Sequence, residues 1–225
     1  MAEKRPKRPL ITTPKGRFKY PHLVQADTEF DAAGRFHVQL VVPEEDAAPL
    51  IRKLAPEHKE AIAAARLEYE AMSEKARKKI VFNPQDFYEA EEETGEPTGN
   101  VIVKFGTKAT LKVKDRLGNE QTVQRVIPIY DAKGQRISGD TELSIWGGTL
   151  GKVSFFTLPY FIPGSGLAGL TLRLAAVQVI ELVSGGAASA ERYGFGSEEG
   201  FEYQPPKDPG PAHDTDESLD DEIPF

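Results

Sequence analysis

Five basic residues occur within 13 positions near the middle of the chain, with Asp115 as the single acidic residue among them: Lys104, Lys108, Lys112, Lys114 and Arg116. Alternate side chains of a β-strand share a face, so the last three would lie together on one side of a strand. Crowded cations repel each other unless a polyanion neutralises them, and a phosphate backbone does so with release of condensed counterions. The stripe therefore indicates phosphate binding, with an ordinary solvated strand face as the open alternative.

Aromatic residues accompany basic residues elsewhere in the sequence. Single-stranded nucleic acid is bound by this combination, because bases stack on aromatic rings inside a positive groove. The predicted stacking residues are Phe18, Tyr20, Phe36, Phe105 and Trp146, and the further predicted phosphate contacts are Arg17, Lys19 and Lys152. Core packing is the alternative for each ring, and the sequence does not decide which rings are exposed.

Other kinds of chemistry find little support in the sequence. There is no cysteine, and the four histidines (His22, His37, His58 and His213) are scattered without ligand-like spacing, so we predict no metal site. Residues 164–169 match GxGxxG but lead into an alternating strand, which favours a hairpin turn over a dinucleotide site. No nucleophile-and-base set is visible and no run is apolar enough to span a membrane. We expect no catalysis, no cofactor and a cytoplasmic location.

The end of the chain differs sharply in charge from the rest. Residues 198–225 carry ten acidic residues and one lysine, a net charge of −9, whereas the preceding 197 residues have a net charge of +2. Such a segment cannot bury enough apolar surface to fold alone. It nevertheless ends in an apolar tip that follows three acids: Asp220, Asp221, Glu222, Ile223, Pro224 and Phe225. A partner with a hydrophobic pocket and a basic rim would use both parts, and a merely solubilising tail is the alternative.

Short alternating segments separated by turns dominate the remainder and predict an all-β fold with a helical insertion at about 44–80, interrupted near Pro56. The expected strands are 17–24, 35–42, 101–114, 121–130, 149–161 and 170–183, arranged as an OB-like antiparallel five-stranded barrel. Pro21 indicates an edge strand or a bulge, and residues 83–99 read as an acidic mobile loop. We predict a folded domain at 1–183 and a flexible linker with a disordered acidic tail at 184–225.

The six terminal residues resemble the C-terminal tip of bacterial single-stranded DNA-binding proteins, which recruits replication and repair proteins. The body is similar to phage-type single-stranded DNA-binding proteins, which place an OB-fold before an acidic tail. The similar segments are residues 16–23 (GRFKYPHL), Gly147-Gly148, and residues 170–182 (LTLRLAAVQVIEL). The resemblance implies sequence-non-specific binding of single strands in phage DNA replication, recombination or repair, without enzymatic activity, in the host cell cytoplasm. It also implies that the tail competes with DNA for the basic groove.

Two other functions stay open. A β-domain could display the tail as a protein-interaction adaptor without touching DNA, and it would tolerate charge reversal at Lys112 and Lys114. A recombination factor that anneals complementary strands would look the same in sequence as a plain binder. The sequence also leaves open a homodimer, the DNA site size and the identity of the tail's partner.

Overall fold

The computed structural model describes residues 8–29, 31–114, 120–137 and 143–184, without the side chains of residues 112–114. The contacts divide the chain after Gly186, and all described residues belong to the first unit. The predicted tail and its tip (residues 185–225) therefore lie outside the described residues, as does Arg116. The predicted boundary at Val183 stays a prediction.

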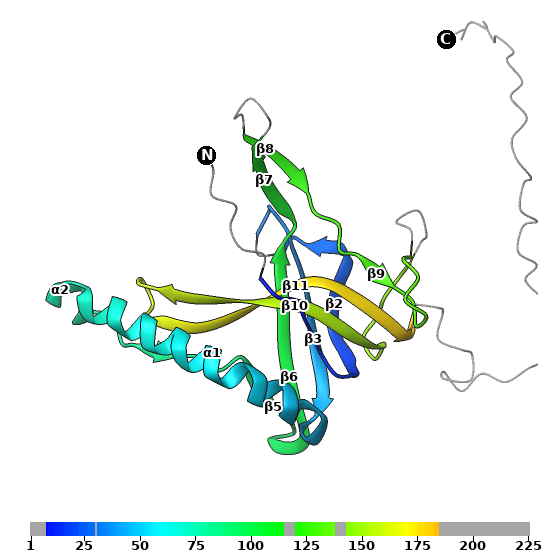
Figure 1. Cartoon of the computed structure of the whole chain (residues 1–225), viewed down its shortest axis with the longest axis horizontal. Helices are drawn as coiled ribbons and strands as arrows, with labels where there is room; N and C mark the ends of the chain where they lie inside the picture. Colours follow the sequence, from blue (N-terminus) through cyan, green and yellow to red (C-terminus); the bar gives the residue numbers. More distant parts are fainter. Residues whose placement is uncertain (1–7, 30, 115–119, 138–142, 185–225) are drawn as a thin grey trace, which may run out of the picture. The chain divides into compact units, whose positions relative to one another are not determined.

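Within the described part, five long strands follow one another around a ring (Figure 1). They are β2 (Gly16–Asp27), β3 (Arg35–Pro43), β6 (Glu96–Lys108), β11 (Leu167–Glu181) and β10 (Leu150–Ile162). The ring closes because β10 pairs with both β11 and β2. A mostly-β fold with a helical insertion is thus confirmed, with five strands in the ring.

Shorter strands extend the ring into a nine-stranded sheet of the described residues. They are β1 (Ile11–Thr12), β4 (Asn83–Pro84), β5 (Tyr88–Glu93) and β9 (Ile129–Tyr130). Strand β11 pairs in parallel with β4, β6 and β9. The sheet is therefore mixed, and the purely antiparallel arrangement expected from the sequence is wrong for these three pairs, because the long connections that precede β11 bring it back in the same direction as these strands.

The predicted strand at 101–114 is two strands in two sheets. Strand β6 ends at Lys108, and β7 (Thr110–Lys114) pairs with β8 (Glu120–Gln124) as a separate two-stranded sheet. The break falls at buried Ala109, whose N–H donates to the Gly34 carbonyl at 2.9 Å and whose carbonyl accepts from the Arg125 N–H at 2.6 Å. The basic stripe is therefore divided between β6 and β7.

The helical insertion follows β3 directly. Helix α1 spans Glu44–Ala71, with three acids in its first turn, and a short α2 spans Glu74–Arg77. Pro56 does not interrupt α1, in contrast to the sequence prediction. Leu50 and Leu54 before it and Ala61 and Ala65 after it are all buried, and packing along this face holds the helix continuous despite the hydrogen bond that Pro removes. Figure 1 shows α1 running beside the β10–β11 hairpin, where Thr157 donates a hydrogen bond to Glu57 at 2.5 Å.

The acidic segment after α2 is not a mobile loop as predicted. Strand β5 pairs antiparallel with β6, and the turn between them has Thr94 and Gly95 at positive φ. This hairpin places Glu89 and Glu91 against the sheet. The predicted bulge at Pro21 is confirmed, because the β2–β3 register shifts between Lys19 and His22.

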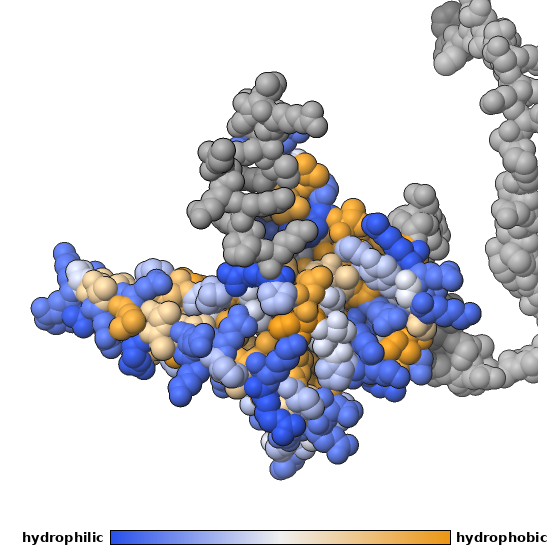
Figure 2. Space-filling view, in the orientation of Figure 1, coloured by the Kyte–Doolittle hydropathy of each residue, from blue (hydrophilic) through white to orange (hydrophobic). Residues whose placement is uncertain are grey.

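The core lies inside the ring. The largest fully buried side chains include Phe18, Phe105, Phe155, Leu40, Leu54 and Leu174. The rings of Phe105 and Phe155 meet at 5.0 Å between centroids. Figure 2 shows hydrophilic residues over much of the helical arm, with hydrophobic residues gathered toward the crossing of the strands. No helix in the described ranges is long and apolar enough to cross a membrane.

Candidate nucleic-acid interface

The outer face of three adjacent ring strands, β3, β6 and β11, holds a cavity of about 630 Å³. Strand alternation creates this face: Phe36 and Val38 point into the core, whereas Arg35, His37 and Gln39 line or border the cavity. We call this cavity the basic groove, after the four basic residues in its lining: Arg35, Lys104, Lys108 and Arg173. Asp27 and Asp31 lie at the same cavity.

Gly106 occupies the centre of the basic groove. It pairs with His37 on one side and with Arg173 on the other. A methyl group at position 106 would lie 2.5 Å from Nη2 and 2.6 Å from Nε of Arg35. The guanidinium of Arg35 therefore turns its Nε–Nη2 edge toward this glycine, beside the strand that carries Arg173.

Three of the four cations of the basic groove form no ion pair with an acid in the described ranges, although Asp27 and Asp31 line the same cavity. Nε of Arg173 is buried and has no hydrogen-bond partner among the described residues. Nearby, Nε of Arg125 donates to the Lys108 carbonyl at 3.1 Å, and burial, followed by repulsion from Arg173, lowers the pKa of Arg125. Within the described ranges no acid forms an ion pair with Arg35, Lys108, Arg125 or Arg173. A buried N–H donor without a partner is costly in a free protein, and it fits a site that an anion completes.

Two of the predicted phosphate contacts are held by acids of the β5–β6 hairpin. Lys104 pairs with Glu89 at 2.8 Å and Lys19 pairs with Glu91 at 3.3 Å. Burial opposes ionisation of Glu91, but hydrogen bonds from Asn100, Thr98 and Lys19 outweigh it and lower the pKa of this carboxyl. Both lysines therefore have an acidic neighbour that a phosphate would have to replace.

A second cavity of about 530 Å³ shares Arg35, Lys104 and Thr171 with the basic groove. Its lining includes two half-buried tyrosines, Tyr88 and Tyr160. Tyr160 lies against Gly169, where an added methyl group would sit 3.1 Å from the phenol oxygen. Burial raises the pKa of Tyr160. The sequence did not indicate these rings, because only the pairing of β5 with β6 and of β10 with β11 brings them to this face.

The predicted stacking residues divide into two groups. Phe18, Phe36 and Phe105 are core residues with exposed fractions of 1%, 6% and 2%, so no base can stack on them and the prediction is wrong for these three. Tyr20 and Trp146 are 63% and 54% exposed and are free to meet a ligand.

Several predicted contacts lie away from the basic groove. Arg17 donates a hydrogen bond to the Gly148 carbonyl at 3.2 Å and is the register partner of Leu150. Leu150 is close in sequence to Trp146 and Lys152. On β3, the partner of Arg17 is Val41, six residues beyond Arg35 and roughly 20 Å along the strand. Lys112 and Lys114 belong to β7, but their side chains lie outside the described part.

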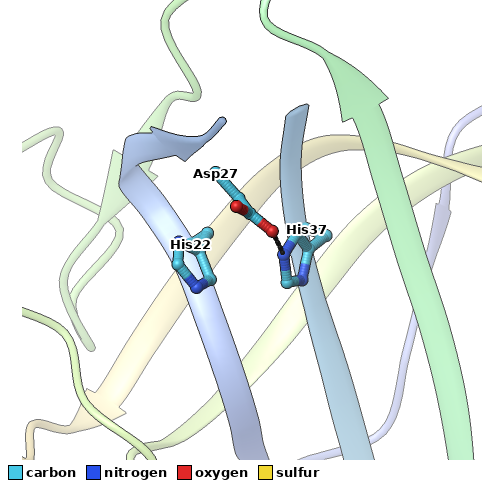
Figure 3. Close-up of side chains that lie close together, drawn as sticks. All are labelled: His22, Asp27 and His37. Atoms are coloured by element: carbon cyan, nitrogen blue, oxygen red, sulfur yellow. Dashed lines mark hydrogen bonds and ion pairs between the residues drawn. The ribbon is translucent and has the colours of Figure 1, made fainter. Parts of the chain in front are cut away.

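Two histidines that are far apart in sequence form a cross-strand pair. His22 and His37 face each other on β2 and β3, with ring centroids 4.7 Å apart. Nε2 of His37 and Oδ2 of Asp27 are hydrogen-bonded at 3.1 Å (Figure 3). A backbone hydrogen bond from Glu29 and the bond with His37 lower the pKa of Asp27. The expectation that the histidines are scattered is wrong for this pair, and cross-strand register is the signal that was missing.

Comparison with known proteins adds independent information. Residues 13–182 match the model of the family described as single-stranded DNA-binding protein, bacteriophage T7. Among solved structures, gp2.5, a single-stranded DNA-binding protein encoded by bacteriophage T7, is 23% identical, with a TM-score of 0.63 over 88% of this chain and 100% of that one. The C-terminally truncated single-stranded DNA-binding protein of bacteriophage Enc34 is 10% identical, with a TM-score of 0.50 over 78% and 87%. Both likenesses are of fold. No curated protein matches the sequence.

Proposed function

Because this chain belongs to the family of single-stranded DNA-binding proteins represented by that of bacteriophage T7, it binds single-stranded DNA in phage replication, and we propose that the strand lies across the basic groove. The observation that carries the proposal is the set of cations around Gly106. Arg35, Lys108 and Arg173 converge on one face and form no ion pair with a described acid, although Asp27 and Asp31 line the same cavity. Phosphates supply the missing charge and release condensed counterions.

Phosphate contact by itself carries no sequence information, so it accounts for binding without sequence preference. Lys104 would join the phosphate contacts by leaving Glu89, since both side chains of that pair are at least half exposed, at 57% and 50%. Exposed ion pairs contribute at most about 1 kcal/mol. The exchange therefore costs little, and the hairpin acid keeps Lys104 in place until DNA arrives.

The adjoining cavity suits bases. Tyr88 and Tyr160 line it next to the shared residues Arg35 and Lys104. An aromatic ring beside a phosphate-binding cation is the pairing that single strands need, because every base can stack on it. Duplex DNA keeps its bases in the stack and gains only the phosphate contacts. We therefore propose that these tyrosines set the preference for single strands.

A second contact region supports a longer footprint. Arg17, Lys152 and exposed Trp146 lie toward the β2–β10 end of the ring, and Lys19 and exposed Tyr20 lie on β2. A strand that extends from the basic groove along the sheet would reach them. Lys112, Lys114 and Arg116 stay proposed phosphate contacts on the basis of the sequence.

The test is binding of fluorescein-labelled oligo-dT and of a duplex of equal length, followed by anisotropy. Substitution of Arg35→Gln together with Lys108→Gln should weaken oligo-dT binding about tenfold or more and flatten its salt dependence. The matched control is Arg52→Gln with Lys53→Gln, an exposed pair on α1 outside both cavities. Equal losses in the two double variants would show that the basic groove is not the binding site.

For the tail we propose the role that its sequence suggests: the acidic segment competes with DNA, and its apolar tip docks replication or repair proteins in the host cytoplasm. The support is the charge split of +2 and −9. A chain that ends at Val183 should bind oligo-dT more tightly at low salt, and tighter binding should disappear when salt screens the tail. Equal affinity of the truncated and full chains for oligo-dT at low salt would refute competition by the tail. No enzymatic step is part of the proposal, and strand annealing stays compatible with it.

A further inference from the structure

Three potential metal ligands meet on the β2–β3 hairpin: His22, Asp27 and His37 (Figure 3). One ligand atom from each lies within 4.8 Å of the other two. In a tetrahedral zinc site with bonds near 2.0–2.1 Å, neighbouring ligand atoms are about 3.3 Å apart. Nε2 of His37 and Oδ2 of Asp27 already stand at 3.1 Å. A small rotation of the half-buried or exposed rings would bring the third ligand to bonding distance.

A backbone hydrogen bond orients the carboxylate of Asp27. Its Oδ1 accepts the backbone N–H of Glu29 at 2.9 Å, which leaves Oδ2 free to turn toward the histidines. Hydrogen bonds of this kind fix metal-ligating carboxylates in established sites. Two imidazoles with one carboxylate are borderline donors that suit zinc, and three protein ligands leave a fourth position open.

We propose that His22, Asp27 and His37 bind one Zn²⁺ ion, whose open position accepts a phosphate oxygen of the bound strand. The second half of this proposal rests on the function proposed above. Nε2 of His37 would bind the ion through the lone pair of the neutral ring, which then carries its proton on Nδ1.

The proposed zinc site lies in the groove where DNA is proposed to bind. Asp27 and His37 line the basic groove together with Arg35, Lys108 and Arg173. These cations oppose a bare dication, and among the three ligands only Asp27 carries a negative charge, which offsets half of it. A phosphate oxygen on the fourth position supplies further negative charge. Zinc and single-stranded DNA should therefore bind cooperatively, each raising the affinity for the other by the same factor.

The experiment titrates the metal-free full chain with Zn²⁺ by calorimetry, and with Co²⁺ by visible absorption, which reports a tetrahedral site directly. The variants are His22→Gln, His37→Gln and Asp27→Asn. Asparagine keeps the oxygen that accepts the Glu29 N–H and removes the charge. The control is His58→Gln, because His58 bonds the Gln85 carbonyl away from the cluster. Thermal melting confirms that each variant is folded.

We expect one zinc ion per chain, with affinity lowered about tenfold or more in the three variants and unchanged in the control. No binding, or binding that the three variants leave intact, overturns the site. Oligo-dT binding is then measured in EDTA and with zinc. Binding in EDTA with no response to zinc refutes the shared phosphate while the proposed function stands. Failure of oligo-dT to bind under either condition refutes the proposed function, whereas the zinc titration without DNA still decides the metal site.

Discussion

Arg173 offers the sharpest test of the basic groove, because its two possible roles predict opposite results. Its Nε is buried without a partner, and its charge repels Arg125. A buried polar group without a hydrogen bond costs about 1–3 kcal/mol. Arg173→Met keeps the length of the side chain and removes the charge. We therefore expect the free energy of unfolding in urea to stay the same or to rise by about 1 kcal/mol.

DNA binding should move the other way. Four basic residues line the basic groove, and each phosphate contact with a single strand contributes about −0.7 to the slope of log K against log salt. The four residues of the basic groove should then contribute about −2.8 to the wild-type slope, and Arg173→Met should reduce this contribution to about −2.1. Over a tenfold rise in salt, the contacts in the basic groove would account for an affinity loss of about 600-fold in the wild type and about 130-fold in the variant.

The measurements are oligo-dT anisotropy across that salt range and urea denaturation of the same samples, with Arg52→Met as the control on α1. An unchanged slope in Arg173→Met would refute phosphate contact at this residue. A loss of more than about 2 kcal/mol in unfolding free energy would show instead that Arg173 is a structural residue, since removal of one member of a satisfied buried network has that cost.

Three further predictions concern other residues. Gly106→Ala should displace the guanidinium of Arg35, whose flexible end is what the new methyl group meets; anisotropy should show oligo-dT affinity lowered several-fold, and urea melts should show little change. Thr149→Val removes the fully buried hydroxyl that bonds both the N–H and the carbonyl of Val183; we expect a loss of about 1–3 kcal/mol in urea, with DNA binding intact once folded, and an unaltered urea midpoint would contradict this. Glu91 has a lowered pKa in the folded state, so its contribution is present above its ordinary pKa and is lost as the pH falls through the folded pKa. As the pH falls below 4.5, the stability of Glu91→Gln in thermal melts should therefore decrease less than that of the wild type. Parallel plots of stability against pH for the two proteins would contradict this prediction.

Alternation along single strands made the ring predictable. The pattern of 35–42 places Phe36, Val38 and Leu40 inside, and the structure has all three buried. The parallel pairings of β11 could not be foreseen in the same way, because they depend on where crossovers of many residues return the chain. Pro56 was misleading for a related reason: the local cost of proline is visible in sequence, whereas the buried face that outweighs it depends on the packing partner.

The interface was harder to predict than the fold. The four lysines of the basic stripe were expected on one strand at 101–114, yet a break at Ala109 assigns Lys104 and Lys108 to β6 and Lys112 and Lys114 to β7. The cations that join the first two, Arg35 and Arg173, come from segments where each is a lone charge next to alternating apolar residues. A single cation at an outward position carries little signal until cross-strand register shows its neighbours.

Two glycines connect these observations. Gly106 leaves room for the guanidinium edge of Arg35, and Gly169 leaves room for the Gln85 carbonyl and the ring of Tyr160. A side chain at position 106 would displace the proposed phosphate-binding guanidinium, and one at position 169 would press on the Gln85 carbonyl and the proposed stacking ring. The two cavities share Arg35, Lys104 and Thr171, so the charge and the ring face one continuous surface. The two glycines thus shape the face proposed to hold phosphate and base together as much as the cations and rings do. A sequence search for cations and aromatic residues alone does not find these glycines.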